Sequence, residues 1–427
     1  MIHSLESLRE VDPKEQLLLC IKGKIVDVTE FAKVHPGGRK PMLALAGRDA
    51  TEAFHNYHPN YVFKTLKKHV IGTVSDWKMN NDEFAKDMHK LRLKLVRKGM
   101  FKPTVGFYVT QAIWLLALFV SSIYLTVFTP FFRIGALLLG LYLQQISLIG
   151  HDFGHNSVTT YRSFDFFIGI ILGNTTGGIS LSWWKDSHNV HHSSPNSLEF
   201  DSDNQLGPVF ATSEGHLQSY FSEFHNQDML FCKASHFLIT KQHMTFYPIL
   251  LVARFNLYFQ SILYLVKNKS EHRFLEIITL LTFWGWILGL STCLPFWSYV
   301  QWMVISHFSS SILEVQICLS HFAETSYSGR PHNDVSDGWF RNQLRTTLDI
   351  SCPRWMDFAH GGLQFQISHH CFPRLPRANL RKATDMLKLV CKKHNVPYHS
   401  LLFYDANKKL ISHMKGIAEK AKKAKIS

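Results

Sequence analysis

The chain has 427 residues, which is enough for two or three domains. Apolar residues make up 46% of the sequence, close to the average of soluble proteins, which excludes a chain embedded in a membrane throughout. The net charge of +14 is compatible with nucleic acid or an anionic membrane as partner. Because Lys and Arg cluster beside the long apolar runs, the sequence favours a membrane and argues against nucleic acid.

Residues 1–76 predict a small soluble domain. Short apolar runs around a Gly-containing turn, "LLLCIKGKIVDVTEF", indicate strands, and "RKPMLALAGRDATEAFHNY" has the apolar spacing of helices. His35 lies in the turn "HPGG", and His58 follows the helical stretch. Two histidines across an apolar crevice are the usual axial pair of an electron-transfer haem. His55 lies close enough in sequence to be an alternative second ligand.

Residues 77–103 form a basic linker with helical spacing of apolar residues at Phe84, Met88, Leu91 and Leu95. Because an apolar span follows at once, this pattern predicts an amphipathic helix that lies on a membrane surface. The alternative is an ordinary helix with a solvated polar face.

Four apolar segments are long enough to span a membrane. The first, at ~1.5 Å per residue, would extend about 36 Å, against a hydrocarbon core of about 30 Å. The stretch 246–266 contains Arg254 and Asn256 and is interpreted as interfacial. The basic linker places both termini in the cytosol by the positive-inside rule. The expected spans are residues 105–128, 134–149, 274–294 and 297–319.

Three histidine clusters adjoin apolar segments on the predicted cytosolic side. They are His151 with His155; His188 with His191 or His192; and His369 with His370, preceded by Gln366. Residues three or four apart share one face of a helix, and imidazole is a good ligand for iron, zinc and copper. Histidines grouped at a membrane boundary indicate a functional site.

His321, at the end of the fourth predicted span, is expected to be an additional ligand; the alternative is a histidine that interacts with a helix dipole. Many neutral imidazoles can hold two metal ions and leave positions open for O2, the oxidant needed to break an unactivated C–H bond. The carboxylates near the clusters are expected to orient ligand rings; they are Asp152, Asp186, Asp201, Asp203 and Asp357. Isolated histidines are expected to be structural; they are His243, His272, His332 and His413.

These motifs resemble a known family. "VDVTEFAKVHPGG" and "LAGRDATEAFHNYHP" are similar to the cytochrome b5 domain, and "HDFGH", "HNVHH" and "QISHH" are similar to the three histidine boxes of membrane desaturases. The set resembles the cytochrome b5-fusion, or front-end, desaturases, in which Gln replaces the first histidine of the third box, here at Gln366. The resemblance implies a small α+β haem domain followed, over residues 104–427, by an all-α integral membrane desaturase with four transmembrane helices under a cytosolic helical cap.

The resemblance also implies the cofactors and their ligands. His35 and His58 would bind haem b, electrons would come from NADH through cytochrome b5 reductase, and O2 would be the co-substrate. No catalytic residue is expected beyond the metal ligands, and Gln366 would be a ligand or a partner of one. Two Fe ions would be held by His151, His155, His188, His191, His192, His321, His369 and His370.

The substrate implied is a long lipid chain. "NSLEFDSDNQ", "HHCFPRLPRANLRK" and "VPYHSLLFYDAN" resemble the plant and fungal sphingolipid Δ8 desaturases, which favours a ceramide or sphingoid long-chain base. The alternative is a fatty acyl chain, because the Δ6 desaturases share "LDISCP" and "GGLQFQ" and a Δ5 enzyme belongs to the same class. A hydroxylase would start from the same hydrogen abstraction. A membrane-anchored electron carrier and a metal transporter are alternatives from other classes.

Two features bear on localisation. Residues 1–30 lack the long apolar run of a signal peptide. Lys423 and Lys425 resemble a dilysine retrieval signal, which implies a multi-pass protein of the endoplasmic reticulum membrane with a cytosolic active site.

Overall fold

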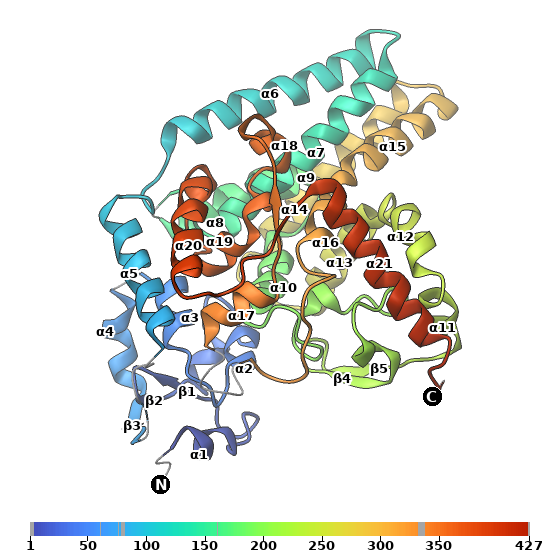
Figure 1. Ribbon diagram of the computed structural model, residues 1–427. Helices are drawn as coiled ribbons and strands as arrows, with labels where there is room; N and C mark the ends of the chain where they lie inside the picture. Colours follow the sequence, from blue (N-terminus) through green and yellow to red (C-terminus); the bar gives the residue numbers. More distant parts are fainter. Residues whose placement is uncertain are drawn as a thin grey trace.

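The computed structural model describes residues 4–59, 61–75, 77, 82–159, 161–331 and 338–425. The long apolar helices lie at one end of the molecule, at the top of Figure 1, and the N-terminal domain and the helical cap lie below them. The predicted domain boundary at residue 76, the isolated His332 and the last two residues of the C-terminal signal lie outside the described residues.

The N-terminal domain has the predicted α+β fold. Its three strands form one antiparallel sheet in the order β1-β2-β3, and Lys22 and Gly23 join β1 to β2 with positive φ angles of 53° and 70°. A two-residue turn with both φ angles positive matches the twist of a hairpin. The strands are β1 (Leu18–Ile21), β2 (Lys24–Asp27) and β3 (Val70–Thr73); the helices are α1 (Leu5–Arg9), α2 (Lys40–Ala44), α3 (Thr51–Tyr57) and α4 (Val62–Leu66).

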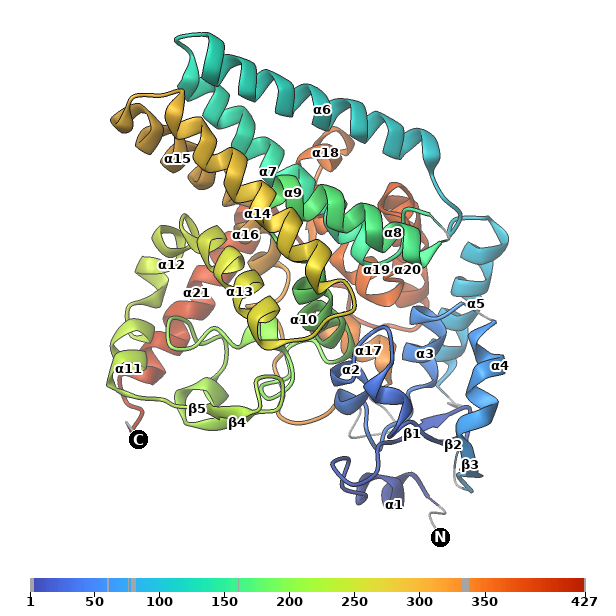
Figure 2. The same cartoon turned by 180° about the vertical axis from the view of Figure 1, so that it is seen from behind.

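The four predicted membrane spans are confirmed as helices of sufficient length and hydropathy. The second span continues five residues beyond the predicted end at residue 149, so that its last turn carries the first histidine cluster. The spans are α6 (Val105–Phe128), α7 (Phe132–Gly154), α14 with the turn that follows it (Arg273–Thr292), and α15 with α16 (Phe296–Leu319). Figure 2, which views the molecule from behind, shows α14 in front of α7.

Two further apolar helix pairs are bent too sharply to be straight spans. The stretch predicted to be interfacial forms α12 (Gln242–Leu250) and α13 (Ala253–Lys267), which meet at 70°. Arg254 lies at this bend, fully buried, and its guanidinium donates to the hydroxyl of Tyr258 at 2.8 Å and to the Gly177 carbonyl at 2.8 Å. These bonds satisfy a charge that would otherwise be costly in an apolar environment.

The linker helix α5 (Glu83–Arg97) corrects one expectation. Its apolar face does not lie on a membrane surface, because Phe84, Met88 and Leu95 are buried in the same apolar core as Leu387 of α20. An ion pair adds a polar contact between the two helices: Oδ2 of Asp87 lies 2.5 Å from Nζ of Lys393. An amphipathic sequence pattern identifies the buried face of a helix but does not distinguish a protein from a membrane as its partner.

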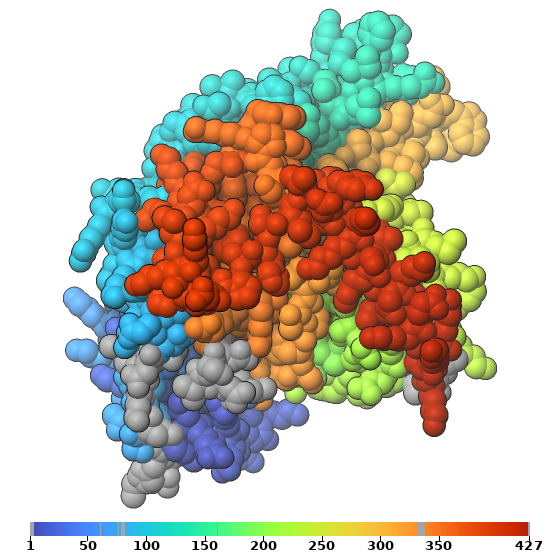
Figure 3. All heavy atoms as spheres, in the orientation of Figure 1, coloured from blue at the N-terminus to red at the C-terminus, as the bar shows by residue number. Residues whose placement is uncertain are grey.

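The cap packs against both the spans and the N-terminal domain. One continuous apolar core contains Leu19 and Ala53 of the N-terminal domain together with Trp339 and Ile367 of the cap. Figure 3 shows the N-terminal residues in contact with the orange and red C-terminal segments. The cap helices are α8 (Arg162–Gly169), α9 (Thr175–Gly177), α10 (Leu181–Ser193), α11 (Lys233–Ile239), α17 (Trp339–Arg345), α18 (Asp357–His360), α19 (Gln366–Cys371), α20 (Leu380–Lys393) and α21 (Phe403–Ala421); its strands pair as β4 (Tyr220–Ser222) with β5 (Gln227–Met229) and β6 (Asp349–Ser351) with β7 (Ser400–Leu402).

Candidate metal centre and haem crevice

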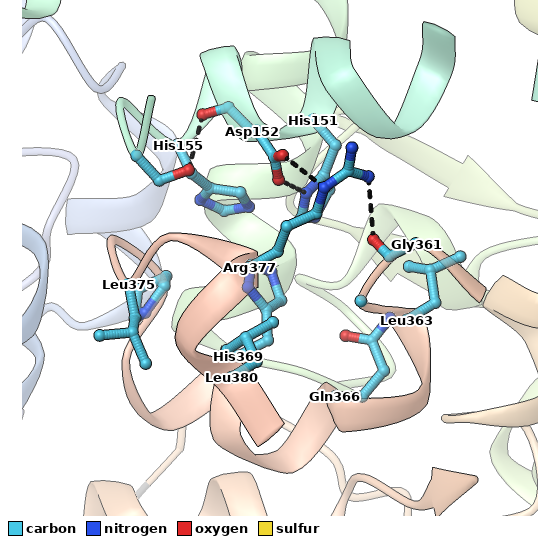
Figure 4. Close-up of a pocket in the computed structure, with 13 residues that line it drawn as sticks. His151, Asp152, His155, Gly361, Leu363, Gln366, His369, Leu375, Arg377 and Leu380 are labelled. Carbon is cyan, nitrogen blue, oxygen red and sulfur yellow. Dashed lines mark hydrogen bonds and ion pairs between the residues drawn. The ribbon is translucent and has the colours of Figure 1, made fainter. Parts of the chain in front are cut away.

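Three helix ends bring the histidine clusters together. The first cluster closes α7, the second lies in the C-terminal half of α10, and the third lies in the short helix α19. Spacing of four residues places His151 and His155 on one face, with ring centroids 4.6 Å apart. Figure 4 shows both rings and that of His369 around a small cavity that Gln366 also lines.

The first group of candidate ligands combines all three clusters. Side-chain nitrogens of its four histidines lie within 4.8 Å of one another: His151, His155, His188 and His369. The Nε2 atoms of His151, His155 and His369 are buried and have no hydrogen-bond partner among the described residues. Buried polar atoms are normally satisfied, so three unpartnered nitrogens that converge fit a metal ion.

The second group contains His191, His321 and His370, again with nitrogens within 4.8 Å of one another. Each ring has an oxygen acceptor for its Nδ1–H: a carboxylate of Asp201 at 3.0 Å, the Thr346 carbonyl at 3.1 Å and the amide oxygen of Gln343 at 2.9 Å, respectively. An acceptor at Nδ1 fixes the tautomer and leaves the Nε2 lone pair for a metal.

His192 lies between the two groups. Its Nε2 is 3.0 Å from Nε2 of His188, and its ring stacks on that of His370 with centroids 4.2 Å apart. Its Nδ1 is buried without a partner among the residues that the structure describes. All eight histidines expected at the metal centre are therefore in one place, divided between two groups and the ring that separates them.

The electrostatics of the cluster suit cation binding. Burial lowers the pKa of His369 and His370 well below the ordinary value, so both rings are neutral, as metal ligands must be. Burial also lowers the pKa of His191, but the carboxylates of Asp201 and Asp203 outweigh this effect and raise it to about 9. A cation, whether a proton or a metal ion, is therefore favoured at His191.

The carboxylates expected to orient ligand rings have different partners. Asp201 and Asp203 lie beside ligand rings, the latter 3.6 Å from Nδ1 of His188. Asp152 lies 3.8 Å from Nδ1 of His151 and also 2.9 Å from Nε of Arg377, as Figure 4 shows, whereas Asp186 lies 2.6 Å from Nζ of Lys40. Asp357 pairs with Arg381.

Gln343, which the sequence analysis did not single out, binds His370 from α17. No local pattern marks this glutamine, because the fold alone brings α17 beside α19.

In the N-terminal domain, the two histidines predicted to be axial ligands lie close together. The rings of His35 and His58 face each other with centroids 5.8 Å apart. Their Nδ1 atoms lie 3.0 Å from the Gly38 carbonyl and 3.1 Å from the Phe54 carbonyl, which leaves both Nε2 atoms for an iron between them. Burial lowers the pKa of His58 to about 4, which keeps it neutral. His55, the alternative ligand, contacts Phe63 and His89 instead.

The candidate haem crevice adjoins helix α10. Asn189 of α10 donates to the Gly37 carbonyl at 3.1 Å, and Asp186 of the same helix pairs with Lys40. The turn that carries His35 therefore contacts the helix that carries the second histidine cluster.

A cavity of about 660 Å³ extends from the metal centre into the apolar part of the molecule. At one end it reaches His151, His188, His191 and His321. Elsewhere its wall is largely apolar and includes Ile146, Ile179, Leu250, Leu257, Leu313 and Ile317. Its size and lining suit a long hydrocarbon chain.

Comparison with known proteins gives the family. The profile of the cytochrome b5-like haem/steroid binding domain matches residues 4–75, and that of the fatty acid desaturase family matches residues 128–402. The chain is 40% identical to a Delta(8)-fatty-acid desaturase of Helianthus annuus, over 94% of this chain and 88% of that one.

The names of two further relatives give different lipids as substrates. An acyl-lipid (9-3)-desaturase of Borago officinalis is 37% identical over 98% of this chain and 93% of its own length. A Delta 8-(E)-sphingolipid desaturase of Emericella nidulans is 34% identical over 91% of this chain and 73% of its own length.

These matches confirm the predicted family and do not favour a protein that only carries electrons or transports metal. The b5-like domain implies haem, and the desaturase family implies iron; the crevice and the histidine groups fit both. The chain belongs to the fatty acid desaturase family, in its cytochrome b5-fusion branch, and is a membrane oxidoreductase that desaturates lipids.

Proposed function

We propose that this desaturase introduces a Δ8 double bond into the long-chain base of a sphingolipid. The observation that carries the proposal is the cavity of about 660 Å³, which is largely apolar and is lined by histidines of both groups. The Δ8 position in the names of the Helianthus and Emericella relatives supports the position of the bond.

The proposed roles follow from the ligand geometry. Two iron ions, when bound with O2, supply the oxidant that removes two hydrogens from the chain. His151, His155, His188 and His369 would hold one ion, and His191, His321 and His370 the other, with His192 between them and available to either. Gln366 lines the same small cavity as His151, His155 and His369, and it would therefore be a neighbour of the ligands of the first ion.

The residues around the ligands have separate tasks. Asp201, Thr346 and Gln343 hold the rings of the second group in one tautomer, so that each ring presents Nε2. The apolar cavity wall excludes water from the reacting carbons, which protects the oxidant from side reactions.

Electrons would enter through the N-terminal domain. His35 and His58 would bind haem b, reduced by NADH through cytochrome b5 reductase. The hydrogen bond from Asn189 to Gly37 is then a direct link between the haem turn and the ligand helix α10. A tethered donor also has a high effective concentration at its acceptor.

The proposed location is the endoplasmic reticulum membrane, with the termini and the metal centre in the cytosol. The basic residues before α6 support this orientation by the positive-inside rule. Access of a cytosolic reductase to the haem crevice requires the same orientation.

The test is lipid analysis of yeast that expresses the chain, with His191→Ala as the inactive control. We expect new Δ8-unsaturated long-chain bases from the unaltered chain and none from His191→Ala, whose haem absorption should be unchanged. His35→Ala should lose the haem spectrum.

The alternative is a Δ6 or Δ5 fatty acyl desaturase, and the name of the Borago acyl-lipid relative is its support. New double bonds in acyl chains alone would establish this alternative. Hydroxylated products would indicate that the reaction stops after the first hydrogen abstraction.

A further inference from the structure

We propose that Glu314 recognises the polar end of the substrate by accepting a hydrogen bond from a hydroxyl or amide N–H near the start of the chain. This inference rests on the proposed sphingolipid function and assigns one residue to substrate choice. The carboxyl group of Glu314 is unusual because it lies within a membrane span.

Glu314 lies in α16, within the fourth membrane span, and is 8% exposed. Its Oε1 is buried and has no hydrogen-bond partner among the described residues. The nearby cation Arg254 directs its nitrogens to Tyr258, Gly177 and Leu143 instead. A buried ionisable group in a span is costly unless something binds it, and such a residue indicates a functional site.

The cavity supplies the place for that partner. Glu314 lines the cavity, as do Leu313 and Ile317 of the same helix and His321 just beyond it. Glu314 precedes His321 by seven residues, which corresponds to roughly 10 Å along a helix. A polar group of the substrate at Glu314 would thus be separated from the metal centre by a short length of hydrocarbon.

The chemistry of a carboxyl group selects among lipids. A ceramide or sphingoid base carries hydroxyls and an amine or amide N–H on its first carbons, and its eighth carbon lies a few bonds beyond them. A fatty acyl ester has only oxygen acceptors at the corresponding end. In its ionised form Glu314 accepts hydrogen bonds and does not donate them, so the carboxylate fits the sphingoid chain.

The control residue is on the same helix. Gln316 is also buried, but it donates to the Ala359 carbonyl at 3.1 Å and does not line the cavity. Gln316→Leu therefore removes a polar side chain from α16 without changing the cavity. Glu314→Gln keeps an oxygen acceptor, whereas Glu314→Leu has none.

The experiment measures kcat/KM of the purified holoenzyme for dihydroceramide and for analogues that lack the C1 or the C3 hydroxyl. We expect the unaltered enzyme to prefer dihydroceramide over at least one analogue by roughly 10- to 100-fold, as for a hydrogen bond to a charged group. Glu314→Leu should abolish this preference, Glu314→Gln should keep part of it, and Gln316→Leu should keep all of it. The ratio is internal to each variant, so a lower yield of folded protein does not affect it.

The outcomes separate the two proposals. Desaturation of acyl lipids without any sphingoid product would overturn the proposed function. Desaturation of dihydroceramide with the same preference in Glu314→Leu as in the unaltered enzyme would overturn the role of Glu314 alone. A preference lost equally in Gln316→Leu would also overturn it, because the effect would then be a general one of α16.

Discussion

At the scale of single residues, the metal centre depends on acceptors for ring N–H groups. His191, His321 and His370 each have an oxygen at Nδ1, from Asp201 for the first ring and from Thr346 and Gln343, in or next to α17, for the other two. Without such an acceptor an imidazole can rotate or present the wrong tautomer. The histidines supply the ligands, and their neighbours decide how the ligands are presented.

Gln343→Leu should weaken iron binding at the second group by about 10- to 100-fold, because His370 loses the acceptor that fixes its tautomer. Iron per chain, measured by elemental analysis after dialysis against a weak chelator, should fall while haem absorption stays constant. Gln343→Glu keeps an acceptor and should retain more iron than Gln343→Leu. Full iron content in Gln343→Leu would contradict the role of Gln343.

At the scale of elements, two contacts fix the donor domain and the linker to the cap. Helix α10 binds the haem turn through Asn189 and Asp186, and α5 packs on α20 through an apolar face bordered by Asp87. Both contacts join segments that are distant in sequence.

Asn189→Leu should slow electron transfer from the haem, because the hydrogen bond from α10 to Gly37 is lost. We expect slower reoxidation of the reduced haem on mixing with O2 and substrate, measured by stopped-flow absorbance, with unchanged haem and iron content. Lys33→Ala is the control, since the Lys33–Glu30 pair lies exposed on the same domain. Equal reoxidation rates in all three proteins would exclude this contact from the path.

Docking of α5 should depend on pH through Asp87. Hydrogen bonds from Lys393, Lys90 and His394 hold the pKa of Asp87 below 3.8 in the folded protein. Its contribution to stability is therefore present above the unfolded value of about 3.9 and is lost as the pH falls through the folded value. Hydrogen exchange of α5 amides should be faster in Asp87→Asn than in the unaltered protein at pH 6. The difference between the two rates should begin to narrow as the pH falls below about 4, after correction for intrinsic exchange; a ratio that does not change with pH would show that the pair contributes nothing.

At the scale of the whole molecule, the donor domain and the cap share an apolar core. Leu19, Val26 and Ala53 of the N-terminal domain belong to the same cluster as Trp339 and Phe340 of α17, and the rings of Tyr57 and Trp339 lie 6.0 Å apart. The fusion therefore has a structural role besides the proposed electronic one, because its removal would expose apolar residues of the cap.

A chain that lacks residues 1–76 should be less stable than the full chain, because part of the shared core becomes exposed to water. Its thermal unfolding in detergent should begin at a lower temperature, and soluble cytochrome b5 added in trans should not restore its lipid desaturation. The full chain without haem is the control for loss of the cofactor alone. Full activity of the shortened chain with added cytochrome b5 would contradict the structural role.

The sequence alone determined the features that depend on local spacing or composition. Length and hydropathy determined the four spans, spacing of three or four residues determined the histidine clusters, and the turn at His35 with the helix before His58 indicated the haem pair.

Four features depend on the folded chain and could not be predicted from the sequence. They are the division of the histidines into two groups, the contact of Gln343 with His370, the packing of α5 on α20 and the position of Glu314 in the cavity wall. The reason is physical. Periodicity shows that one face of a helix is buried, but the partner of that face depends on contacts between residues far apart in the chain.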